Sequence, residues 1–379
     1  MSGVYLDFNA TAPVRPEAIT AMTRALETGG NPSSIHAAGR AARAVVEQAR
    51  EDVAALIGGP ASTVVFTGGG TEANALAVES AVATGSKRLI ISAIEHESVV
   101  ETAKASGAQV ELLPVGADGL ADLDWLRTRL ASWDAADGKP FVALMLANNE
   151  TGIIQPVAEA SEIVRAAEGW LHVDAIQAAG KIALDSRALG ADTLTISGHK
   201  FGGPQGVGAL TFGPRATLVR RQHGGGQERG RRAGTENVAG IAGLGAAAAA
   251  LRDLETFAAQ AALRDLAAAC LEAEGAVVIA PDSPRLANTL CVASPGHASD
   301  LQVMGLDLMG VMVSAGSACS SGKVKASAVL TAMGLTDLAP YAIRVSGGWA
   351  TRETDWAAFV AAWSDVHSRH AARRRAPAA

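Results

Sequence analysis

Charged side chains follow two predicted strands at the points where these strands end. Residues 170–173 form a short strand pattern that is followed by Asp174, and Gln177 stands three residues further on. Residues 192–196 form a second strand pattern, which is followed by the loop that contains Lys200. Open α/β sheets bind their ligands beyond the carboxyl ends of the strands. An aspartate at this place also suits a helix cap, and a lysine in a glycine-rich loop also suits a solvated surface.

A glycine turn provides a third chemical feature. Residues 66–74 (FTGGGTEAN) end a strand, turn at three glycines and open a helix at Thr71. Exposed N–H groups at a helix start suit a phosphate, and glycines let the phosphate approach closely. The G-x-G-x-x-A spacing at 68–73, with Glu95 after the next strand, also fits a dinucleotide fingerprint, and a purely structural turn stays open. A P-loop is excluded because no Lys-Ser/Thr pair follows at the required spacing.

Together, these features match what pyridoxal phosphate requires from a protein. The cofactor needs a lysine for a Schiff base, a carboxylate for its pyridine nitrogen, donors for its phosphate and a flat group over its ring. Lys200 and Asp174 supply the first two. The helix start supplies the third, with the Ser197 hydroxyl and the His199 imidazole. His96 follows another predicted strand and supplies the fourth, although a helix-capping or surface histidine is the alternative.

The motifs of this chain resemble those of the cysteine desulfurases, which belong to the class V aminotransferase family of fold-type I pyridoxal phosphate enzymes. They are TGGGTEAN, IEHESV, ANNETG, HVDAIQ, SGHK and HGGGQERGRRAGTEN, and the resemblance runs from YLDFNATAPV (5–14) to IRVSGG (343–348). The segment SAGSACSSG (314–322) resembles the active-site cysteine loop of the group I (NifS/IscS-like) branch. VKASAVL (324–330) and Gly347 depart from the usual pattern without removing a catalytic group.

The resemblance implies a pyridoxal 5'-phosphate site formed by Gly70, Thr71, His96, Asn149, Asp174, Gln177, Ser197, His199, Lys200 and Thr235. Lys200 is expected to hold the cofactor as a Schiff base, and Asp174 to pair with the pyridine nitrogen. Gln177 is expected to hydrogen-bond the ring hydroxyl, and His96 to stack on the ring. The phosphate is expected to bind Gly70, Thr71, Ser197 and His199, together with Thr235 of the neighbouring subunit, which implies a homodimer.

For the reaction, the resemblance implies that L-cysteine is converted to L-alanine while its sulfur passes to Cys319 as a persulfide. Lys200, His96 and Cys319 are the expected catalytic residues, and Asn149 and Arg344 are expected to bind the substrate carboxylate. An iron–sulfur scaffold or another sulfur-acceptor protein is the expected partner. The alternatives are a selenocysteine lyase or another class V enzyme, a nicotinamide dehydrogenase that uses the glycine turn, and a non-catalytic sulfur-trafficking protein.

Local sequence supports part of this assignment. Cys319 has small neighbours, which favour a solvent-accessible loop over a buried structural thiol. Arg344 lies within a predicted strand, where either a bidentate hold on a carboxylate or a structural ion pair explains it. Cys270 and Cys291 lie in apolar segments, and we predict that both pack in the core.

Composition narrows the class of protein. The 379 residues exceed twice the common domain size of ~150 residues, which predicts two domains. Hydrophobic residues make up 49% and charged residues 18%, so global disorder is excluded. A net charge of −6 argues against nucleic-acid and membrane partners, and the three cysteines have no metal-binding spacing. Low cysteine usage, no signal-peptide pattern and a longest apolar run of only 14 residues predict a soluble cytoplasmic protein.

Short strands alternate with helices along the chain, which predicts an α/β fold with a mostly parallel, buried sheet. The expected strands are 62–66, 88–92, 109–113, 141–146, 170–173, 192–196 and 207–212, and the expected helices are 34–57 (capped by Ser33 and Ser34), 71–84, 97–106, 121–131 and 156–167. Further on, we expect helices at 237–255, 257–274, 299–308, 326–333 and 353–370, and strands near 276–279, 287–293, 311–314 and 342–346. We predict a large cofactor-binding domain at 15–255 and a smaller α/β domain formed by 1–14 plus 256–379, which carries the cysteine loop.

Overall fold

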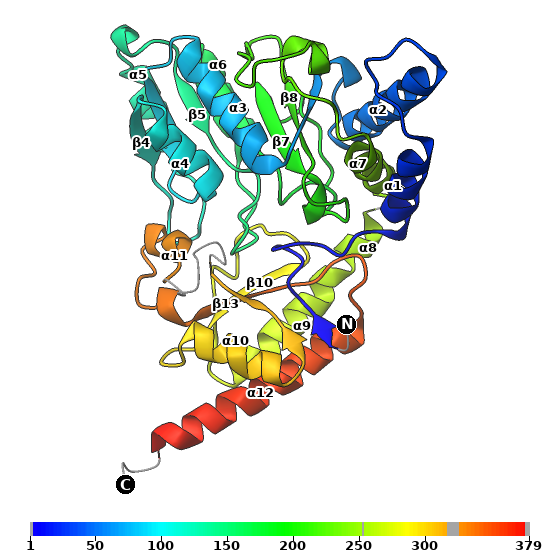
Figure 1. Ribbon diagram of the computed structural model, residues 1–379. Helices are drawn as coiled ribbons and strands as arrows, with labels where there is room; N and C mark the ends of the chain where they lie inside the picture. Colours follow the sequence, from blue (N-terminus) through cyan, green and yellow to red (C-terminus); the bar gives the residue numbers. More distant parts are fainter. Residues whose placement is uncertain (1–2, 252–253, 317–325, 376–379) are drawn as a thin grey trace.

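The computed structural model describes residues 3–251, 254–316 and 326–375 (Figure 1). Its large sheet has the strand order β2-β8-β7-β6-β5-β3-β4. The bounds are β2 Val64–Thr67, β3 Arg88–Ser92, β4 Gln109–Leu113, β5 Phe141–Ala143, β6 Trp170–Asp174, β7 Thr193–Ser197 and β8 Gly208–Phe212. Strands β4, β3, β5, β6 and β7 run parallel, whereas β8 is antiparallel to both of its neighbours. The predicted α/β fold with a mostly parallel sheet is confirmed.

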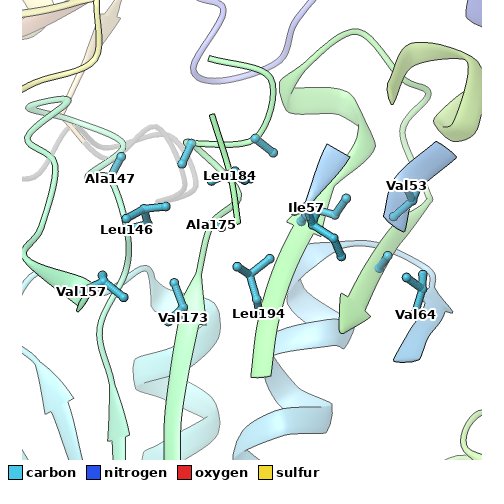
Figure 2. Packing of buried hydrophobic residues seen from close by; sticks show 14 of the residues in the cluster. Val53, Ile57, Val64, Leu146, Ala147, Val157, Val173, Ala175, Leu184 and Leu194 are labelled. Atoms are coloured by element: carbon cyan, nitrogen blue, oxygen red, sulfur yellow. The ribbon is translucent and has the colours of Figure 1, made fainter. Parts of the chain in front are cut away.

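Helices cover both faces of the large sheet, because successive strand residues point to opposite faces and both sets are apolar. Val173 and Leu194 belong to the same buried cluster as Val53 and Ile57 near the end of α2 (Figure 2). Trp170 belongs instead to a cluster with residues of α3 and α4. The helices of this part are α1 Pro16–Thr28, α2 Ala37–Leu56, α3 Gly70–Ala83, α4 Glu97–Ala105, α5 Leu123–Ala131, α6 Val157–Ala166 and α7 Val238–Ala249.

A second, antiparallel sheet has the order β12-β13-β10-β9 and lies beside the carboxyl ends of the large-sheet strands (Figure 1). Leu290 of β10 belongs to a buried cluster that includes residues of the helices of this part, among them Trp363 of α12. Cys291, the next residue, packs against Ile94 and Met145, which follow β3 and β5. The elements are β9 Val277–Val278, β10 Thr289–Ala293, β12 Ser314–Ala315, β13 Ala342–Ser346, α8 Glu255–Ala258, α9 Gln260–Ala273, α10 Ser299–Leu308, α11 Ala328–Ala332 and α12 Glu353–Arg375.

The N-terminal segment connects the two sheets. Strand β1 (Val4–Tyr5) pairs with β11 (Val311–Met312), and Asp7 forms a bridge with Ser346 at the end of β13. The chain then crosses to the large sheet, where the Ala12 N–H donates to the carbonyl of His199 at 2.7 Å. We therefore keep the division into 15–255 and 1–14 plus 256–379 as a proposal.

Most predicted elements occur within a few residues of their expected bounds, and two helices differ at one end. The helix predicted at 34–57 begins at Ala37, because His36 Nδ1 accepts the Gly39 N–H at 3.2 Å and caps the helix in place of Ser33 and Ser34. The helix predicted at 237–255 ends at Ala249, and α8 follows as a separate short helix. Short 3₁₀ helices complete the chain: Ala61–Thr63, Ala135–Asp137, Gly198–Lys200, Gln227–Gly230 and Ala339–Tyr341. Within the described residues, we find no helix with the length and apolar character that a bilayer crossing requires.

Candidate active site

A cavity of about 360 Å³ lies beyond the carboxyl ends of the large-sheet strands, beside the second sheet. It brings together ten of the predicted site residues: Gly70, Thr71, His96, Asn149, Asp174, Gln177, Ser197, His199, Lys200 and Arg344. Arg344 comes from β13 of the second sheet, and the other nine come from the carboxyl ends of large-sheet strands or from the segments that follow them. The carboxyl edge of the large sheet, where the sequence predicted the site, therefore forms a wall of the cavity.

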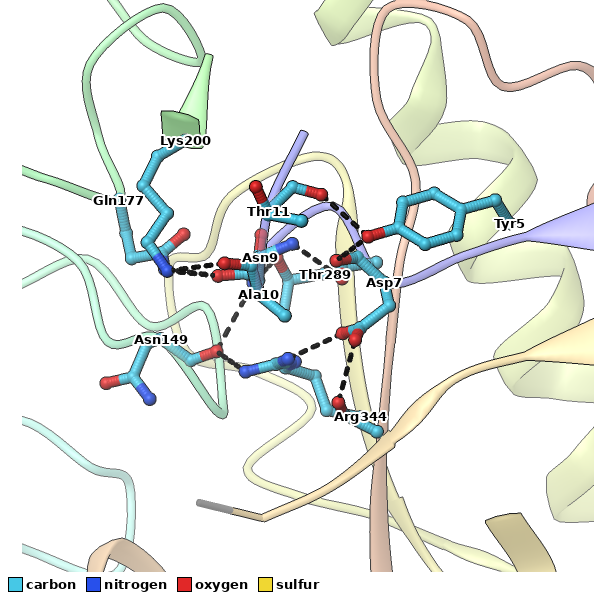
Figure 3. A network of polar contacts seen from close by, with 12 residues as sticks. Tyr5, Asp7, Asn9, Ala10, Thr11, Asn149, Gln177, Lys200, Thr289 and Arg344 are labelled. Atoms are coloured by element: carbon cyan, nitrogen blue, oxygen red, sulfur yellow. Dashed lines mark hydrogen bonds and ion pairs between the residues drawn. The ribbon is translucent and has the colours of Figure 1, made fainter. Parts of the chain in front are cut away.

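Lys200 and Asp174 lie at the ends of neighbouring parallel strands, β7 and β6. Lys200 Nζ donates to the carbonyl oxygens of Asn9 at 2.9 Å and Ala10 at 2.8 Å (Figure 3). Asp174 is 4% exposed, and its Oδ1 accepts the Ile176 N–H at 2.9 Å. Burial raises the pKa of Asp174, while the Ile176 N–H and nearby positive groups oppose this rise. A buried carboxylate and an amine thus line one cavity.

Asn74 of α3 ties Asp174 to the histidine at the start of α4. Its Nδ2 group donates to Asp174 Oδ2 at 2.7 Å and to Ser98 Oγ at 2.9 Å. Since the Ser98 oxygen accepts from Asn74, its own O–H donates to His96 Nδ1 at 2.8 Å. The Ser98 backbone N–H reaches the same nitrogen at 3.0 Å. His96 therefore caps α4 while it lines the cavity, and a neutral ring carries its proton on Nε2.

A second buried histidine, on β6, fixes the orientation of the Asn74 amide. Burial lowers the pKa of His172 to about 3, so the ring is neutral. His172 Nδ1 lies 3.0 Å from Thr193 Oγ1, which accepts the Trp170 Nε1–H at 2.9 Å and so donates its own proton to the ring. The Nε2–H of His172 then donates to Asn74 Oδ1 at 3.0 Å. Because this hydrogen bond fixes the oxygen of the Asn74 amide, its two N–H groups are directed to Asp174 Oδ2 and Ser98 Oγ.

The start of α3 also lines the cavity. Its N-cap is Gly69, which has a φ of 151° and no side chain to accept the first N–H groups. A Cβ at Gly70 would lie 2.3 Å from Ile176 Cδ1, so a larger residue there would displace the wall. His199 Nδ1 lies 3.2 Å from Thr11 Oγ1, and burial together with the Lys200 charge lowers the pKa of His199 to about 4. An uncapped helix start next to polar side chains suits an anion.

Arg344 of β13 has an ion-pair partner within the chain. Its Nη2 group lies 2.6 Å from Asp7 Oδ1, and its Nη1 group donates to the carbonyl oxygen of Asn149 at 3.1 Å (Figure 3). Its Nε is buried and has no hydrogen bond among the described residues. The ion pair that the sequence left open therefore exists, and the guanidinium also lines the cavity.

Glu95 lines the same cavity as an orphaned carboxyl group. It is 8% exposed, and neither of its side-chain oxygens makes a well-formed hydrogen bond within the described part of the chain. Burial, and secondarily the Asp174 charge, raise its pKa well above the ordinary value. The sequence pattern had suggested a ribose-binding role for Glu95 only under the dinucleotide alternative.

Thr235 is exposed and does not line the cavity in this chain. The loop before it is anchored by Glu228, which has a φ of 46° and a buried, two-pronged ion pair with Arg50 at 2.8 and 2.9 Å. Glu228 Oε2 also accepts the Phe66 N–H at 2.9 Å. These contacts fix the loop at Glu228. Because Thr235 does not line the cavity of its own chain, its predicted role stays a proposal.

The structure describes two of the three cysteines. Cys319 lies outside the described residues. Cys291 is 2% exposed, and burial raises the pKa of its thiol to about 12, while half-buried Cys270 packs against the core of the second sheet. The prediction of core packing is confirmed for Cys291 and Cys270.

Sequence reasoning assigned no role to Asn9, Asn74, His172 or Lys181. Asn74 and His172 lie inside the motifs TGGGTEAN and HVDAIQ, and Asn9 lies inside YLDFNATAPV. Their position within these motifs was the available signal. Which groups they contact depends on segments far away in the chain.

The donor set fits pyridoxal 5'-phosphate. The Lys200 amine and the buried Asp174 carboxylate line the cavity from neighbouring strands, and His96 lines it from the start of α4. The start of α3 has no side-chain cap and offers N–H groups to a phosphate.

Known proteins share the sequence and the fold. The family description Aminotransferase class-V matches residues 4–359. The cysteine desulfurase IscS of Dictyoglomus turgidum is 39% identical over 364 residues, which cover 93% of this chain and 91% of the relative. The IscS-like cysteine desulfurase of Mycobacterium tuberculosis is 38% identical over 373 residues, with 93% of each chain covered.

A NifS-like protein from Rickettsia africae, solved by X-ray crystallography, superimposes with a TM-score of 0.89 at 32% identity. The match covers 97% of this chain and 99% of that protein. Because both the sequence and the fold match over nearly the whole length, this chain belongs to the class-V aminotransferase family of pyridoxal-phosphate-dependent enzymes.

Proposed function

We infer that the cavity is the site of a cysteine desulfurase reaction. The protein is a pyridoxal-phosphate-dependent cysteine desulfurase, since its family uses this cofactor and the curated relatives that match over most of their length are cysteine desulfurases. It converts L-cysteine to L-alanine and transfers the sulfur. When bound, the cofactor supplies an electron sink that stabilises negative charge on the substrate. The residue roles that follow are our proposal.

We propose that Lys200 holds the cofactor and, when released as an amine, moves the substrate Cα proton. The Lys200 amine donates to two backbone carbonyl oxygens of the N-terminal segment, that of Asn9 at 2.9 Å and that of Ala10 at 2.8 Å. Asp174 provides the negative charge for the pyridine nitrogen. Asn74 and the Ile176 N–H hold its two oxygens in place, so the carboxylate enters the reaction with fixed geometry.

His96 is proposed to lie over the cofactor ring and to assist proton transfer. Its Nδ1 is fully engaged with Ser98, which leaves the Nε2–H as the group that can serve a ligand. Gln177 is proposed to donate a hydrogen bond to the ring hydroxyl. Its Nε2 group already acts as a donor, to the Asn9 carbonyl at 2.9 Å.

The phosphate is proposed to bind at the start of α3, through Gly70 and Thr71, with Ser197 and His199 from the end of β7. Thr235 is proposed to reach the phosphate site of a second copy of the chain. A homodimer follows from this role and remains a prediction.

Asn149 and Arg344 are proposed to bind the substrate carboxylate. The buried Arg344 Nε has no hydrogen bond among the described residues, which supports a role for the guanidinium in ligand binding. Asp7 stabilises the arginine charge and orients the planar group.

Cys319 is proposed to accept the sulfur. As a thiolate it attacks the substrate sulfur, a sulfur–sulfur bond forms, the carbon–sulfur bond breaks, and its electron pair stays with the carbon that becomes alanine. An iron–sulfur scaffold or another sulfur acceptor would then take the persulfide sulfur. This partner and a cytoplasmic location stay predictions.

The observation that carries the proposed residue roles is the placement of the Lys200 amine and the Asp174 carboxylate at adjacent strand ends in one cavity. The purified protein should bind pyridoxal 5'-phosphate and absorb visible light, and borohydride should trap the cofactor on the Lys200 peptide, as read by mass spectrometry. Lys200→Ala should abolish the covalent link, whereas Lys104→Ala, at an exposed site on α4, should preserve it. Cofactor trapped on another lysine would refute the assignment.

The role of Cys319 has its own test. Cys319→Ser should keep the bound cofactor and its spectral response to L-cysteine but release almost no alanine, because a serine hydroxyl is a far weaker nucleophile toward sulfur. Mass spectrometry after one turnover should find the added sulfur atom on the wild-type Cys319 peptide. Wild-type alanine release by this variant would contradict the role.

A further inference from the structure

Lys181 is a buried amine to which the proposed reaction assigns no role. It is 4% exposed and lies four residues after Gln177 in the sequence. Burial, the Lys200 charge and the Arg344 charge all lower its pKa well below the ordinary value. Asp7, the carboxylate beside Arg344, is itself held in that ion pair. Burying a lysine without a carboxylate partner is costly, so its contacts need an explanation.

Two amide oxygens surround this amine. Lys181 Nζ donates to Asn9 Oδ1 at 2.6 Å and to Gln177 Oε1 at 2.7 Å. Both amides have only one possible orientation, because each nitrogen faces a backbone carbonyl, which can only accept. Gln177 Nε2 donates to the Asn9 carbonyl at 2.9 Å, and Asn9 Nδ2 donates to the Asn149 carbonyl at 3.3 Å (Figure 3).

The two oxygens therefore face Lys181, and Lys181 must donate to both. A charged ammonium has three N–H groups and a neutral amine has two, so either form satisfies both acceptors. Without this amine, two buried amide oxygens would lose a strong partner, and only the Asn9 carbonyl would still hold the Gln177 amide in this orientation.

We propose that Lys181 is a positioning residue that locks the Gln177 amide with its N–H groups directed to the ring oxygen of the bound cofactor. Gln177 lines the cavity, and its Nε2 group has two hydrogens, of which the Asn9 carbonyl uses one. The second hydrogen is thus available to a ligand oxygen. This inference rests on the proposed role of Gln177. Lys181 acts only through that amide and does not touch the reacting atoms.

The test is the pH midpoint of the visible absorption change of the cofactor-loaded protein, which needs no turnover. A donor to the ring oxygen stabilises the more negative, deprotonated form of the chromophore. Its loss in Lys181→Met should therefore raise the midpoint by about half a pH unit or more. Gln177→Ala should raise the midpoint similarly, and Lys104→Met, on the surface, should leave it unchanged.

A double-mutant cycle separates positioning from a direct charge effect. If Lys181 acts through Gln177, then Lys181→Met should add no further shift in the Gln177→Ala background. If Lys181→Met does not fold, Lys181→Gln takes its place, because glutamine keeps an N–H donor at shorter reach. Lys181→Gln should raise the midpoint by a smaller amount, and only when Gln177 is present.

Each contrary outcome is informative. A full additional shift in the double variant would show that the lysine charge acts directly, which overturns the inference. An unchanged midpoint in Lys181→Met beside a shifted Gln177→Ala would also overturn it while leaving the proposed role of Gln177 intact. An unchanged midpoint in Gln177→Ala would overturn both.

Discussion

Replacing Asn74 by leucine tests whether a buried hydrogen-bond chain holds the Asp174 carboxylate. Asn74 is fully buried, donates to Asp174 Oδ2 at 2.7 Å, and accepts the His172 Nε2–H at 3.0 Å. Leucine branches at the same carbon as asparagine but is larger, so Asn74→Leu removes these contacts and leaves crowding rather than a cavity. A hydrogen bond to a charged group contributes about 1.5–3 kcal/mol, and an orphaned buried N–H costs about 1–3 kcal/mol. We expect the free energy of unfolding to fall by about 3–5 kcal/mol.

The loss should depend on pH. Burial raises the pKa of Asp174, and the Asn74 bond is one of the contacts that oppose this rise. Without it, the pKa rises further. Above the ordinary pKa of an aspartate, the native state then binds more protons than the unfolded state, so stability falls as pH increases until the raised pKa is passed. The variant should therefore lose more stability at mildly alkaline pH than at acidic pH.

Urea unfolding of the cofactor-free protein at one acidic and one mildly alkaline pH measures this effect. Ser98→Ala is the matched control, because it removes the second acceptor of the Asn74 amide and leaves the bond to Asp174 in place. We expect it to cost about 1 kcal/mol with little dependence on pH. A loss in Asn74→Leu that equals the loss in Ser98→Ala at both pH values would refute the reasoning.

Three further predictions concern other parts of the molecule. Gly70→Val should weaken cofactor binding at least tenfold in equilibrium dialysis, because its Cβ would lie 2.3 Å from an Ile176 carbon and crowd the helix start; wild-type affinity would contradict this. Arg50→Met should lower the free energy of unfolding by about 3–5 kcal/mol in urea titrations, because it leaves the buried Glu228 carboxylate unpaired, and a loss under about 1 kcal/mol would exclude that explanation. Cys291 should resist alkylation at neutral pH in the native protein, since burial raises its pKa to about 12, and rapid labelling seen by mass spectrometry would disprove its burial.

Sequence patterns predicted the elements of this fold and the strand ends that carry Asp174 and Lys200, because each depends on residues a few positions apart. Alternating apolar residues define a strand, and the residue after the strand is then placed at a known edge of the sheet. The cap of the second helix was predicted wrongly, since Ser33, Ser34 and His36 are all able to accept an N–H group and only the backbone path selects His36.

The partners of the site residues were decided by the tertiary structure alone. Asp7 and Arg344 are 337 positions apart, and Asn74 and Asp174 are 100 positions apart, so no local pattern pairs them. Hydrogen bonding in a buried site requires that every donor meets an acceptor, and this condition is met only when the N-terminal segment, α3 and the strand ends of the large sheet come together. The sequence by itself determined which chemical groups stand at the edge of the sheet. The packing of distant segments decided how each group is oriented, because burial removes the water that would otherwise satisfy them.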